Sequence, residues 1–354
     1  MQNPFTTTFS KIPDGTYIAT DQTAEIIENF SYDRPSESVY KITGVRGSGK
    51  TVLLAKIEEE FERPERKNEG WLVYRLTPAR DMIKQLASFM YKESFIKEKT
   101  KSRSLNISAN VLGTGAGIGV SSTSHDELID VGVELDEMLK TATQKGKKIL
   151  VGIDEVSKTE DMITFASEFG VWLRAGYSIY LVCTGLYENI EQLVNVKNLT
   201  FFRRATTIRT EPLKQVRMSE MYRKKLDIDV SIAKQLAQIT RGYPYAFQEL
   251  GILYFGKGHK ESIESITSDL KAELFSYAYE KIWEELSGED RAMIRLLLDK
   301  EEYKREEVIK NMEKPANYSI YRDRLIKRGI ITARHAFVSL ALPFFADYIK
   351  EYAL

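Results

Sequence analysis

The sequence predicts an α/β fold that begins with a five-stranded parallel sheet and continues into wholly helical segments. The first observation is a series of nearly uninterrupted apolar segments that alternate with helical patterns, which is typical of a parallel sheet covered on both faces. The second is the change to helical patterns alone after Pro212. The third is a C-terminal spacing of three helices followed by a hairpin. These observations indicate three domains, over residues 1–211, 212–285 and 286–354.

The elements of the first domain follow from hydrophobic periodicity. The five expected strands are residues 39–43, 71–76, 149–153, 179–183 and 205–209. The helices expected around them are residues 24–30, 51–61, 81–91, 125–143 and 161–176. A β-hairpin insertion is expected over residues 105–122, with the glycine-rich stretch 113–117 at its tip. That stretch lacks a following Lys-Ser/Thr pair and a helix start, so we interpret it as a turn and not as a phosphate loop.

The remaining sequence predicts a helical lid and then a winged helix. Lid helices are expected at residues 218–226, 231–238, 244–254 and 262–286. The winged-helix pattern has helices at residues 290–299, 305–311 and 317–328, a short hairpin at 330–341 and a last helix at 343–352.

Composition excludes several classes of protein. The formal net charge of +0 gives the whole molecule no general attraction for polyanions, so any nucleic-acid contact must use a local basic face. Cys183 is the single cysteine, which suits a reducing compartment. His125, His259 and His335 do not have the spacing of zinc ligands. The sequence contains neither a signal-peptide pattern nor an apolar run of membrane-spanning length, and we expect a cytoplasmic protein.

A complete G-x-x-x-x-G-K-[ST] motif lies between the first expected strand and the helix after it, the context in which this motif forms a phosphate-binding loop. Glycines let main-chain N–H groups surround phosphates, and the following helix N-terminus favours negative charge. Lys50 is expected to contact the β- and γ-phosphates of ATP or ADP, and the Thr51 hydroxyl to bind Mg²⁺. The expected nucleotide-binding residues are Gly44, Val45, Arg46, Gly47, Ser48, Gly49, Lys50, Thr51 and Val52.

Two further strand ends carry candidate catalytic groups. Asp154 follows the apolar strand 149–153, where a second Mg²⁺ contact is expected, and Glu155 beside it can polarise an attacking water. The alternative is that the two acids only cap the following helix. Thr184 ends the next strand and is expected either to hold that water or sense the γ-phosphate, or to serve as a turn hydroxyl before Gly185.

Arg203 and Arg204 precede the fifth expected strand. Either could act as an arginine finger on a nucleotide bound by a neighbouring subunit, which would require a homo-oligomer. The alternative is a pair of solvated arginines. The sequence leaves both readings open.

These motifs together resemble AAA+-type P-loop ATPases. The lid sequence Arg241-Gly242-Tyr243-Pro244 resembles the G-x-P motif of STAND and archaeal-type ATPases, and this resemblance implies that Pro244 lies near the adenine. Asn3-Pro4-Phe5-Thr6 and the winged-helix pattern resemble a group of prokaryotic ATP-binding proteins distantly related to origin-recognition initiators. The chain departs from the family at Ile18-Ala19-Thr20-Asp21, where a Gly-Arg pair is usual, and it has Gln248 and Glu249 in place of a second-sensor arginine. These departures predict slow hydrolysis.

The expected third helix of the winged helix is basic and is a candidate for DNA recognition over residues 318–334. Its cations accompany one acid, Asp323, and two tyrosines. The side chains concerned are Arg322, Arg324, Lys327 and Arg328, with Tyr318 and Tyr321 among them and Arg334 on the wing. The alternative is a solvated basic face on a domain that binds protein.

The sequence therefore predicts an ATPase that acts as a nucleotide-dependent switch, with slow hydrolysis coupled to binding of DNA or a protein partner. One alternative is a DNA-binding regulator in which the nucleotide is structural. Another is a small-molecule kinase, which Glu155 disfavours because an adjacent glutamate favours water as the acceptor.

Overall fold

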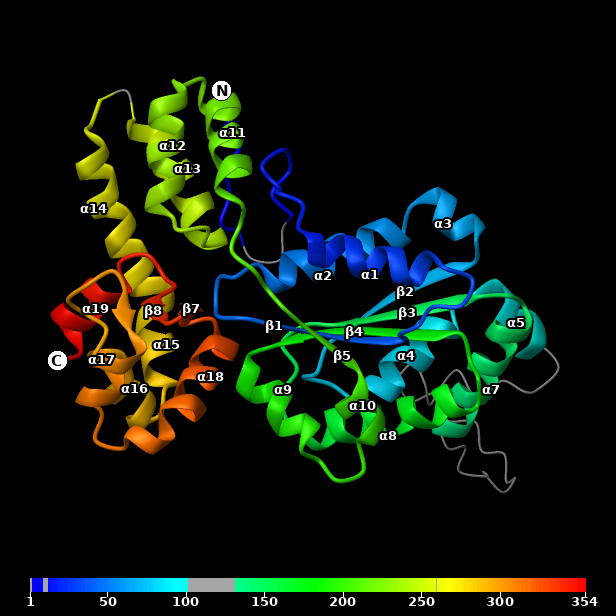
Figure 1. Cartoon of the computed structure of the whole chain (residues 1–354). Coiled ribbons are helices and arrows are strands. Elements are labelled where there is room, and N and C mark those ends of the chain that lie inside the picture. The colour runs from blue at the N-terminus through cyan, green and yellow to red at the C-terminus, as the bar shows by residue number, and fades with distance from the viewer. Residues whose placement is uncertain (1, 9–11, 101–130, 259) are drawn as a thin grey trace, which may run out of the picture. The chain divides into compact units, whose positions relative to one another are not determined.

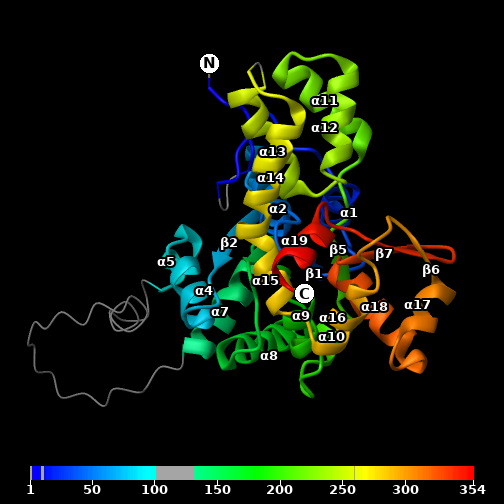
Figure 2. The same cartoon turned by 90° about the vertical axis from the view of Figure 1, so that its left-hand side faces the viewer.

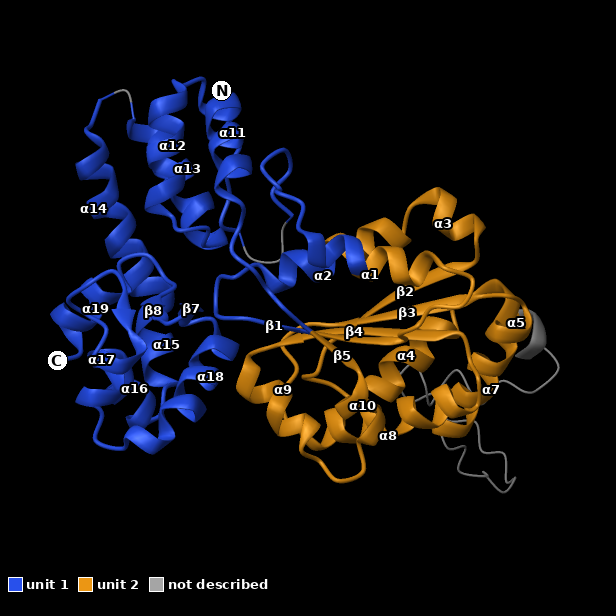
Figure 3. Cartoon of the chain, viewed as in Figure 1, with its two compact units in different colours: residues 1–25, 42–55, 208–354 blue, residues 26–41, 56–207 orange. Residues whose placement is uncertain are grey.

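The computed structural model describes residues 2–8, 12–100, 131–258 and 260–354. The expected hairpin at 105–122 lies outside these residues. The chain forms two compact units (Figure 3). Unit 1 contains residues 1–25, 42–55 and 208–354, and unit 2 contains residues 26–41 and 56–207.

The expected five-stranded parallel sheet is present, in the order β2-β3-β4-β1-β5 (Figure 1). The strands are β1 (Val39–Thr43), β2 (Trp71–Leu76), β3 (Lys148–Ile153), β4 (Ile179–Gly185) and β5 (Thr206–Arg209). In unit 2 both β2 and β4 pair with β3 in parallel, with Val73 opposite Leu150 and Val151 opposite Leu181. Residues 179–185 are all buried, which explains why the central strands have continuous apolar sequences without alternation.

Side chains of unit 2 pack on both faces of its strands. One face carries a cluster of aromatic rings, in which the ring centroids of Phe61 and Trp71 are 4.4 Å apart and those of Phe30 and Tyr180 are 5.1 Å apart. On the other face, Phe165, Phe169 and other apolar side chains of the helices form a fully buried core. The helices that lie wholly in this unit are α3 (Pro64–Asn68), α4 (Met82–Met90), α5 (Ser94–Thr100), α7 (Val131–Gln144), α8 (Glu160–Arg174), α9 (Tyr187–Val194) and α10 (Thr200–Arg204). Helices α1 (Asp21–Ser31) and α2 (Lys50–Phe61) contribute residues to both units.

In unit 1 the expected lid helices form a bundle whose members lie side by side in both views (Figures 1 and 2). They are α11 (Gln215–Leu226), α12 (Val230–Ile239), α13 (Pro244–Lys257) and α14 (Ile263–Leu274). Helix α13 begins with Pro244, whose missing N–H costs nothing at a first helical position. The stretch expected at 262–286 changes after α14 to a π-helical turn, η1 (Phe275–Tyr279), and then to α15 (Glu280–Glu284).

The C-terminal part of unit 1 has the order of elements of a winged helix. Its helices are α16 (Gly288–Arg295), α17 (Arg305–Asn311), α18 (Tyr318–Arg328) and α19 (Phe345–Tyr352), with a 3₁₀ turn, η2 (Pro315–Asn317), before α18. Its strands β6 (Tyr303–Lys304), β7 (Ile331–Arg334) and β8 (Phe337–Leu340) form an antiparallel sheet in the order β6-β8-β7. Helix α18 ends at Gly329, which has a φ of +78° that favours glycine.

Candidate nucleotide-binding site

The expected phosphate loop lies between β1 and α2. Gly47 and Gly49 have φ angles of +70° and +85°, a left-handed conformation that glycine adopts without the strain a Cβ would cause. The Ser48 N–H donates to the Val45 carbonyl at 3.2 Å, which closes the turn. Helix α2 then begins at Lys50, with Thr51 and Val52 half-buried in its first turn. The loop therefore presents a helix N-terminus and a glycine-lined turn, a geometry suited to an anion.

Gly44 is required by close packing at the base of the loop. A Cβ at this position would lie 2.0 Å from Thr210 Oγ1 and 2.5 Å from Ser48 Oγ. Those two hydroxyls are themselves hydrogen-bonded, with Thr210 donating to Ser48 at 2.9 Å, and the Thr210 N–H donates to the Thr43 carbonyl at 2.8 Å. Thr210 thus fixes the base of the loop to the end of β5, a role that the sequence analysis did not assign.

The Lys50 ammonium lies across the loop. It donates to the carbonyls of Gly44 at 3.1 Å and Val45 at 3.0 Å. Phosphate oxygens would compete with these carbonyls for the ammonium, because hydrogen bonds between a cation and an anion are stronger than those to a neutral acceptor. The loop residues fit a nucleotide phosphate by this test: a cation, two glycines at positive φ and a helix N-terminus occur in eight consecutive residues, 44–51.

The start of α13 packs directly on the apex of the loop, within unit 1. Tyr243 donates its hydroxyl to the Arg46 carbonyl at 2.6 Å, and the Tyr245 N–H donates to the Gly47 carbonyl at 3.1 Å. A Cβ at Gly49 would be 3.8 Å from Pro244 Cβ, so this proline lies close to the loop. The sequence indicates Pro244 only through a family resemblance, and it carries no signal for a role of the tyrosines on either side.

Asp154, Glu155 and Thr184 form a hydrogen-bonded group at the ends of β3 and β4, within unit 2. Thr184, which is fully buried, donates its hydroxyl to Asp154 Oδ1. The Glu155 N–H donates to the same Asp154 oxygen at 3.1 Å and to Thr184 Oγ1 at 3.2 Å. These contacts orient the Asp154 carboxylate, an oxygen ligand of the kind that Mg²⁺ prefers. The Thr51 hydroxyl also offers an oxygen atom. Both expected metal ligands therefore have the type of ligand atom that Mg²⁺ prefers.

Glu155 has an unusual main-chain conformation. Its φ is +55°, in the left-handed region that side chains other than those of Gly, Asn and Asp rarely adopt. Its side chain is exposed. Strain of this kind tends to occur at functional sites, where the surrounding structure holds it in place. Here the two hydrogen bonds of the Glu155 N–H supply that restraint.

The candidate arginine fingers lie in the last turn of α10, a short helix that the sequence analysis did not expect. Both side chains are exposed, and Arg203 Nε donates to the Val194 carbonyl at 3.2 Å. The Arg203 guanidinium is therefore held by a neutral carbonyl of its own chain, which an anionic acceptor could replace.

The basic residues of α18 make different contacts. Arg324 and Arg328 form ion pairs with the buried Asp290, with N–O distances of 2.7 Å and 3.6 Å. Arg322 pairs with Asp323 at 2.8 Å on the surface. The exposed positions of this region that carry a cation are Lys327 and Arg334. The basic character of the sequence thus overstates the charge that the helix presents to solvent.

The described residues contain no group of three or more His, Cys, Asp and Glu side chains arranged to hold a metal ion. Such a group is not required for Mg²⁺ bound with a nucleotide. The ion takes most of its ligands from water and phosphate oxygens, so one or two protein oxygens are enough. Across the described ranges, no helix combines the length and apolar character needed to span a bilayer.

The chain was compared with family models, with curated protein sequences and with solved structures. A family model described as a domain of unknown function, DUF8462, matches residues 276–349. No curated protein sequence matches the chain. The Walker-type ATPase PABY2304 of Pyrococcus abyssi is 16% identical with a TM-score of 0.62, and the match covers 93% of this chain and 95% of that one.

The ORC2 protein of Aeropyrum pernix, solved as ADPNP and ADP complexes, is 12% identical with a TM-score of 0.53. This match covers 93% of this chain and 92% of that one. Both likenesses are of fold. They show that the chain has a P-loop ATPase fold distantly similar to that of AAA+ initiator-type proteins, as the sequence resemblance predicted.

Proposed function

We propose that this chain, which has the fold of a P-loop ATPase, binds ATP with Mg²⁺ through residues 44–52 and hydrolyses it slowly as a nucleotide-dependent switch. The observation that carries this proposal is the loop itself. Its glycines at positive φ, its cation and its helix N-terminus form an anion site, and two hydrogen bonds join its apex to residues 243–245 at the start of α13.

Each residue of the site has a role in this proposal. Lys50 exchanges its carbonyl partners for the β- and γ-phosphates. Glu155 accepts a proton from the attacking water, and Thr184 keeps the Asp154 carboxylate in one orientation. Thr51 and Asp154 each offer an oxygen that would suit Mg²⁺, and the ion would supply charge neutralisation on the phosphates. Hydrolysis is slow because Gln248 and Glu249 occupy the place where related lids carry an arginine, which leaves developing negative charge less stabilised.

Isothermal titration with ATP and Mg²⁺ tests binding. Wild type is expected to give a saturable isotherm, and Lys50→Ala to lose it, because the phosphates then lose their point charge. Identical traces for both proteins would refute the nucleotide site. Phosphate release tests hydrolysis, since Glu155→Gln should bind ATP yet release phosphate at least about 100-fold more slowly, the usual contribution of a general base. A phosphorylated metabolite in place of free phosphate would support the small-molecule kinase instead.

The output of the switch is the second part of this function, and we propose duplex DNA as its partner through Arg322, Lys327 and Arg334. Arg324 and Arg328 are engaged by Asp290, so about three phosphate contacts remain once a DNA phosphate replaces Asp323 as the partner of Arg322. Three contacts predict a slope near −2.7 in a plot of log affinity against log salt concentration. Lys327→Ala with Arg334→Ala should lower the magnitude of that slope by about 2. Absence of DNA binding at low salt would leave α18 as a protein-binding helix.

Self-association is proposed only for catalysis by Arg203 or Arg204 across an interface. Light scattering with and without ATP measures the oligomeric state. If the protein is monomeric in both conditions, an arginine finger from a second copy is ruled out. If it assembles with ATP, Arg203→Ala with Arg204→Ala should reduce phosphate release without reducing ATP affinity.

A further inference from the structure

The side chain at the apex of the phosphate loop contacts the C-terminal region. Arg46 donates to Glu285 Oε1 from Nε at 3.1 Å and from a terminal nitrogen at 2.5 Å. Both residues belong to unit 1, and their side chains are 40% and 35% exposed. Arg46 lies between Val45, whose carbonyl accepts from Lys50, and Gly47. A change in the hydrogen bonds of Lys50 therefore occurs one residue away from this ion pair.

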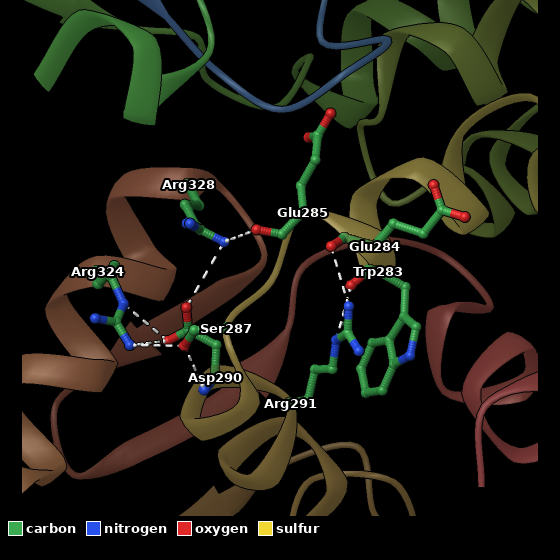
Figure 4. A network of polar contacts seen from close by, with 8 residues as sticks. All are labelled: Trp283, Glu284, Glu285, Ser287, Asp290, Arg291, Arg324 and Arg328. Atoms are coloured by element: carbon green, nitrogen blue, oxygen red, sulfur yellow. Dashed lines mark hydrogen bonds and ion pairs between the residues drawn. The ribbon is translucent and has the colours of Figure 1, made fainter. Parts of the chain in front are cut away.

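Glu285 follows the last residue of α15, and arginine side chains from two other helices hold this helix end. Arg291 of α16 donates to the carbonyls of Trp283 and Glu284, at 3.0 Å each. Arg328 of α18 donates to the carbonyl of Glu285 at 3.2 Å. Figure 4 shows these three carbonyls facing the two guanidinium groups. The last carbonyls of a helix need such donors, so α15, α16 and α18 are joined at this point.

Asp290 makes the junction rigid. Its carboxylate is fully buried and accepts from Arg324 Nε at 2.9 Å and from a terminal nitrogen of Arg324 at 2.7 Å, while Arg328 lies 3.6 Å from its other oxygen (Figure 4). The Asp290 N–H is capped by Ser287. Loss of one partner of a buried ion pair costs far more than loss of an exposed pair. Helix α18 should therefore move together with the end of α15. The half-exposed Arg46–Glu285 pair should be easier to break than the contacts of the buried Asp290.

The end of α18 also lies against the loop. A Cβ at Gly329 would be 3.7 Å from Val45 Cβ, within ordinary contact distance. The loop thus approaches the C-terminal region at two points, through the ion pair of Arg46 and through Val45, which lies close to Gly329. Val45 also supplies a carbonyl that accepts from the Lys50 ammonium, and Arg46 is the next residue in the chain.

We propose that the Arg46–Glu285 ion pair is a regulatory contact that couples nucleotide binding at the loop to the mobility of α18. This inference rests on the proposed function. Phosphates draw Lys50 away from the Gly44 and Val45 carbonyls, the loop apex rearranges, and Arg46 separates from Glu285. The C-terminal helices then lose one of their attachments to the loop. Loss of an exposed ion pair changes an equilibrium constant by about two- to fivefold. The pair therefore shifts the balance between attached and detached α18 and does not switch it completely.

Hydrogen exchange of the amides of residues 318–328 tests this coupling, with a non-hydrolysable ATP analogue and Mg²⁺ as the ligand. In wild type, saturating ligand should speed exchange by about two- to fivefold, the range that loss of one exposed pair allows. Glu285→Gln keeps the main-chain carbonyl for Arg328 but removes the charge. It should show the faster exchange without ligand and no further change with it.

Glu284→Gln is the matched control, because it makes the same chemical change at the neighbouring position, where the glutamate pairs with Lys281. It should respond to ligand as wild type does. Titration of the same samples separates the two hypotheses. If wild type does not bind the analogue, the proposed function fails and this coupling with it. If it binds and Glu285→Gln keeps the wild-type response, or if exchange slows on binding, the coupling alone is overturned.

Discussion

The hydroxyl of Tyr243 donates a 2.6 Å hydrogen bond to the main-chain oxygen of Arg46. Tyr243 is 4% exposed, and burial raises the pKa of its phenol well above the usual value, so the protonated, hydrogen-bond-donating form is favoured. A buried donor and acceptor that satisfy each other are costly to separate. The conformation of the loop apex therefore depends on a residue almost 200 positions later in the chain.

Tyr243→Phe is expected to lower the free energy of unfolding by about 1–2 kcal/mol, because the Arg46 carbonyl loses its donor while the ring still packs. The loop apex should become less well ordered, and ATP affinity should fall. Chemical denaturation and isothermal titration measure the two effects. Tyr245→Phe is the control: it makes the same chemical change, yet the contact of Tyr245 with the loop uses its main-chain N–H. Equal losses in both variants would argue against a specific role for the Tyr243 hydroxyl.

Thr184→Val is expected to reduce phosphate release by about 10- to 100-fold, the usual effect of removing a group that orients a metal ligand. The substitution preserves volume but removes the hydroxyl that holds Asp154 Oδ1 and accepts from the Glu155 N–H. Thr184→Ser keeps the hydroxyl and should retain most activity. The Mg²⁺ concentration at half-maximal rate is the informative measurement. A lower rate with an unchanged Mg²⁺ dependence would assign Thr184 to positioning water instead of Asp154.

Glu155→Gly is expected to stabilise the protein while removing hydrolysis. Glycine adopts a φ of +55° without the Cβ strain that glutamate bears, a relief of about 1 kcal/mol that outweighs the extra freedom glycine gives the unfolded chain. Glu155→Ala removes the same carboxylate but keeps the Cβ, so it should also be inactive yet less stable than the glycine variant. Thermal unfolding compares the three proteins. A glycine variant less stable than the alanine variant would show that residue 155 is unstrained.

The sequence predicted the sheet and the phosphate loop well because both depend on local patterns. Residues 179–183 are apolar without a break, and this pattern is produced by burial on both faces of one strand. The loop motif is contiguous and needs glycine at Gly47 and Gly49 for conformational reasons that act within the loop. Signals of this kind are visible without knowing what packs against the segment. The two-residue strand β6 was missed because it is too short to show alternation.

Long-range polar contacts could not be predicted in the same way. The pairing of Arg46 with Glu285 joins residues 239 positions apart, and neither residue differs in sequence context from a solvated charge. The basic pattern of α18 was visible, but Arg324 and Arg328 turn out to serve Asp290, an acid that the sequence analysis treated as part of a helix start. A cluster of cations has the same sequence whether it binds phosphates outside or a buried carboxylate inside.

Glu58 provides a prediction about pH. Its carboxylate is 4% exposed and accepts from Arg75 Nε at 2.7 Å, while Arg75 also binds both oxygens of Glu62. Burial raises the pKa of Glu58 above 4.5 although Arg75 opposes this, and the nearby charges of Glu62 and Asp154 add to the rise. The folded state thus holds a proton that the unfolded chain has already lost, so stability falls as pH rises through this window and remains reduced at pH 7.5.

Glu58→Gln keeps an acceptor for Arg75 and removes the buried charge, so it should be more stable than wild type by about 1 kcal/mol at pH 7.5, and this advantage should disappear towards pH 4.5.

Glu62→Gln is the control of opposite sign. Hydrogen bonding from Arg75 lowers the pKa of Glu62, so its contribution is present above 4.5 and is lost as pH falls. That variant should be less stable by a few tenths of a kcal/mol at pH 7.5, a small effect because the side chain is partly exposed, and the deficit should shrink in acid. Thermal unfolding of the three proteins from pH 4.5 to 7.5 measures both trends. If the Glu58→Gln difference is independent of pH, the Glu58 carboxylate has the same pKa in the folded and unfolded states, and Arg75 compensates fully for its burial.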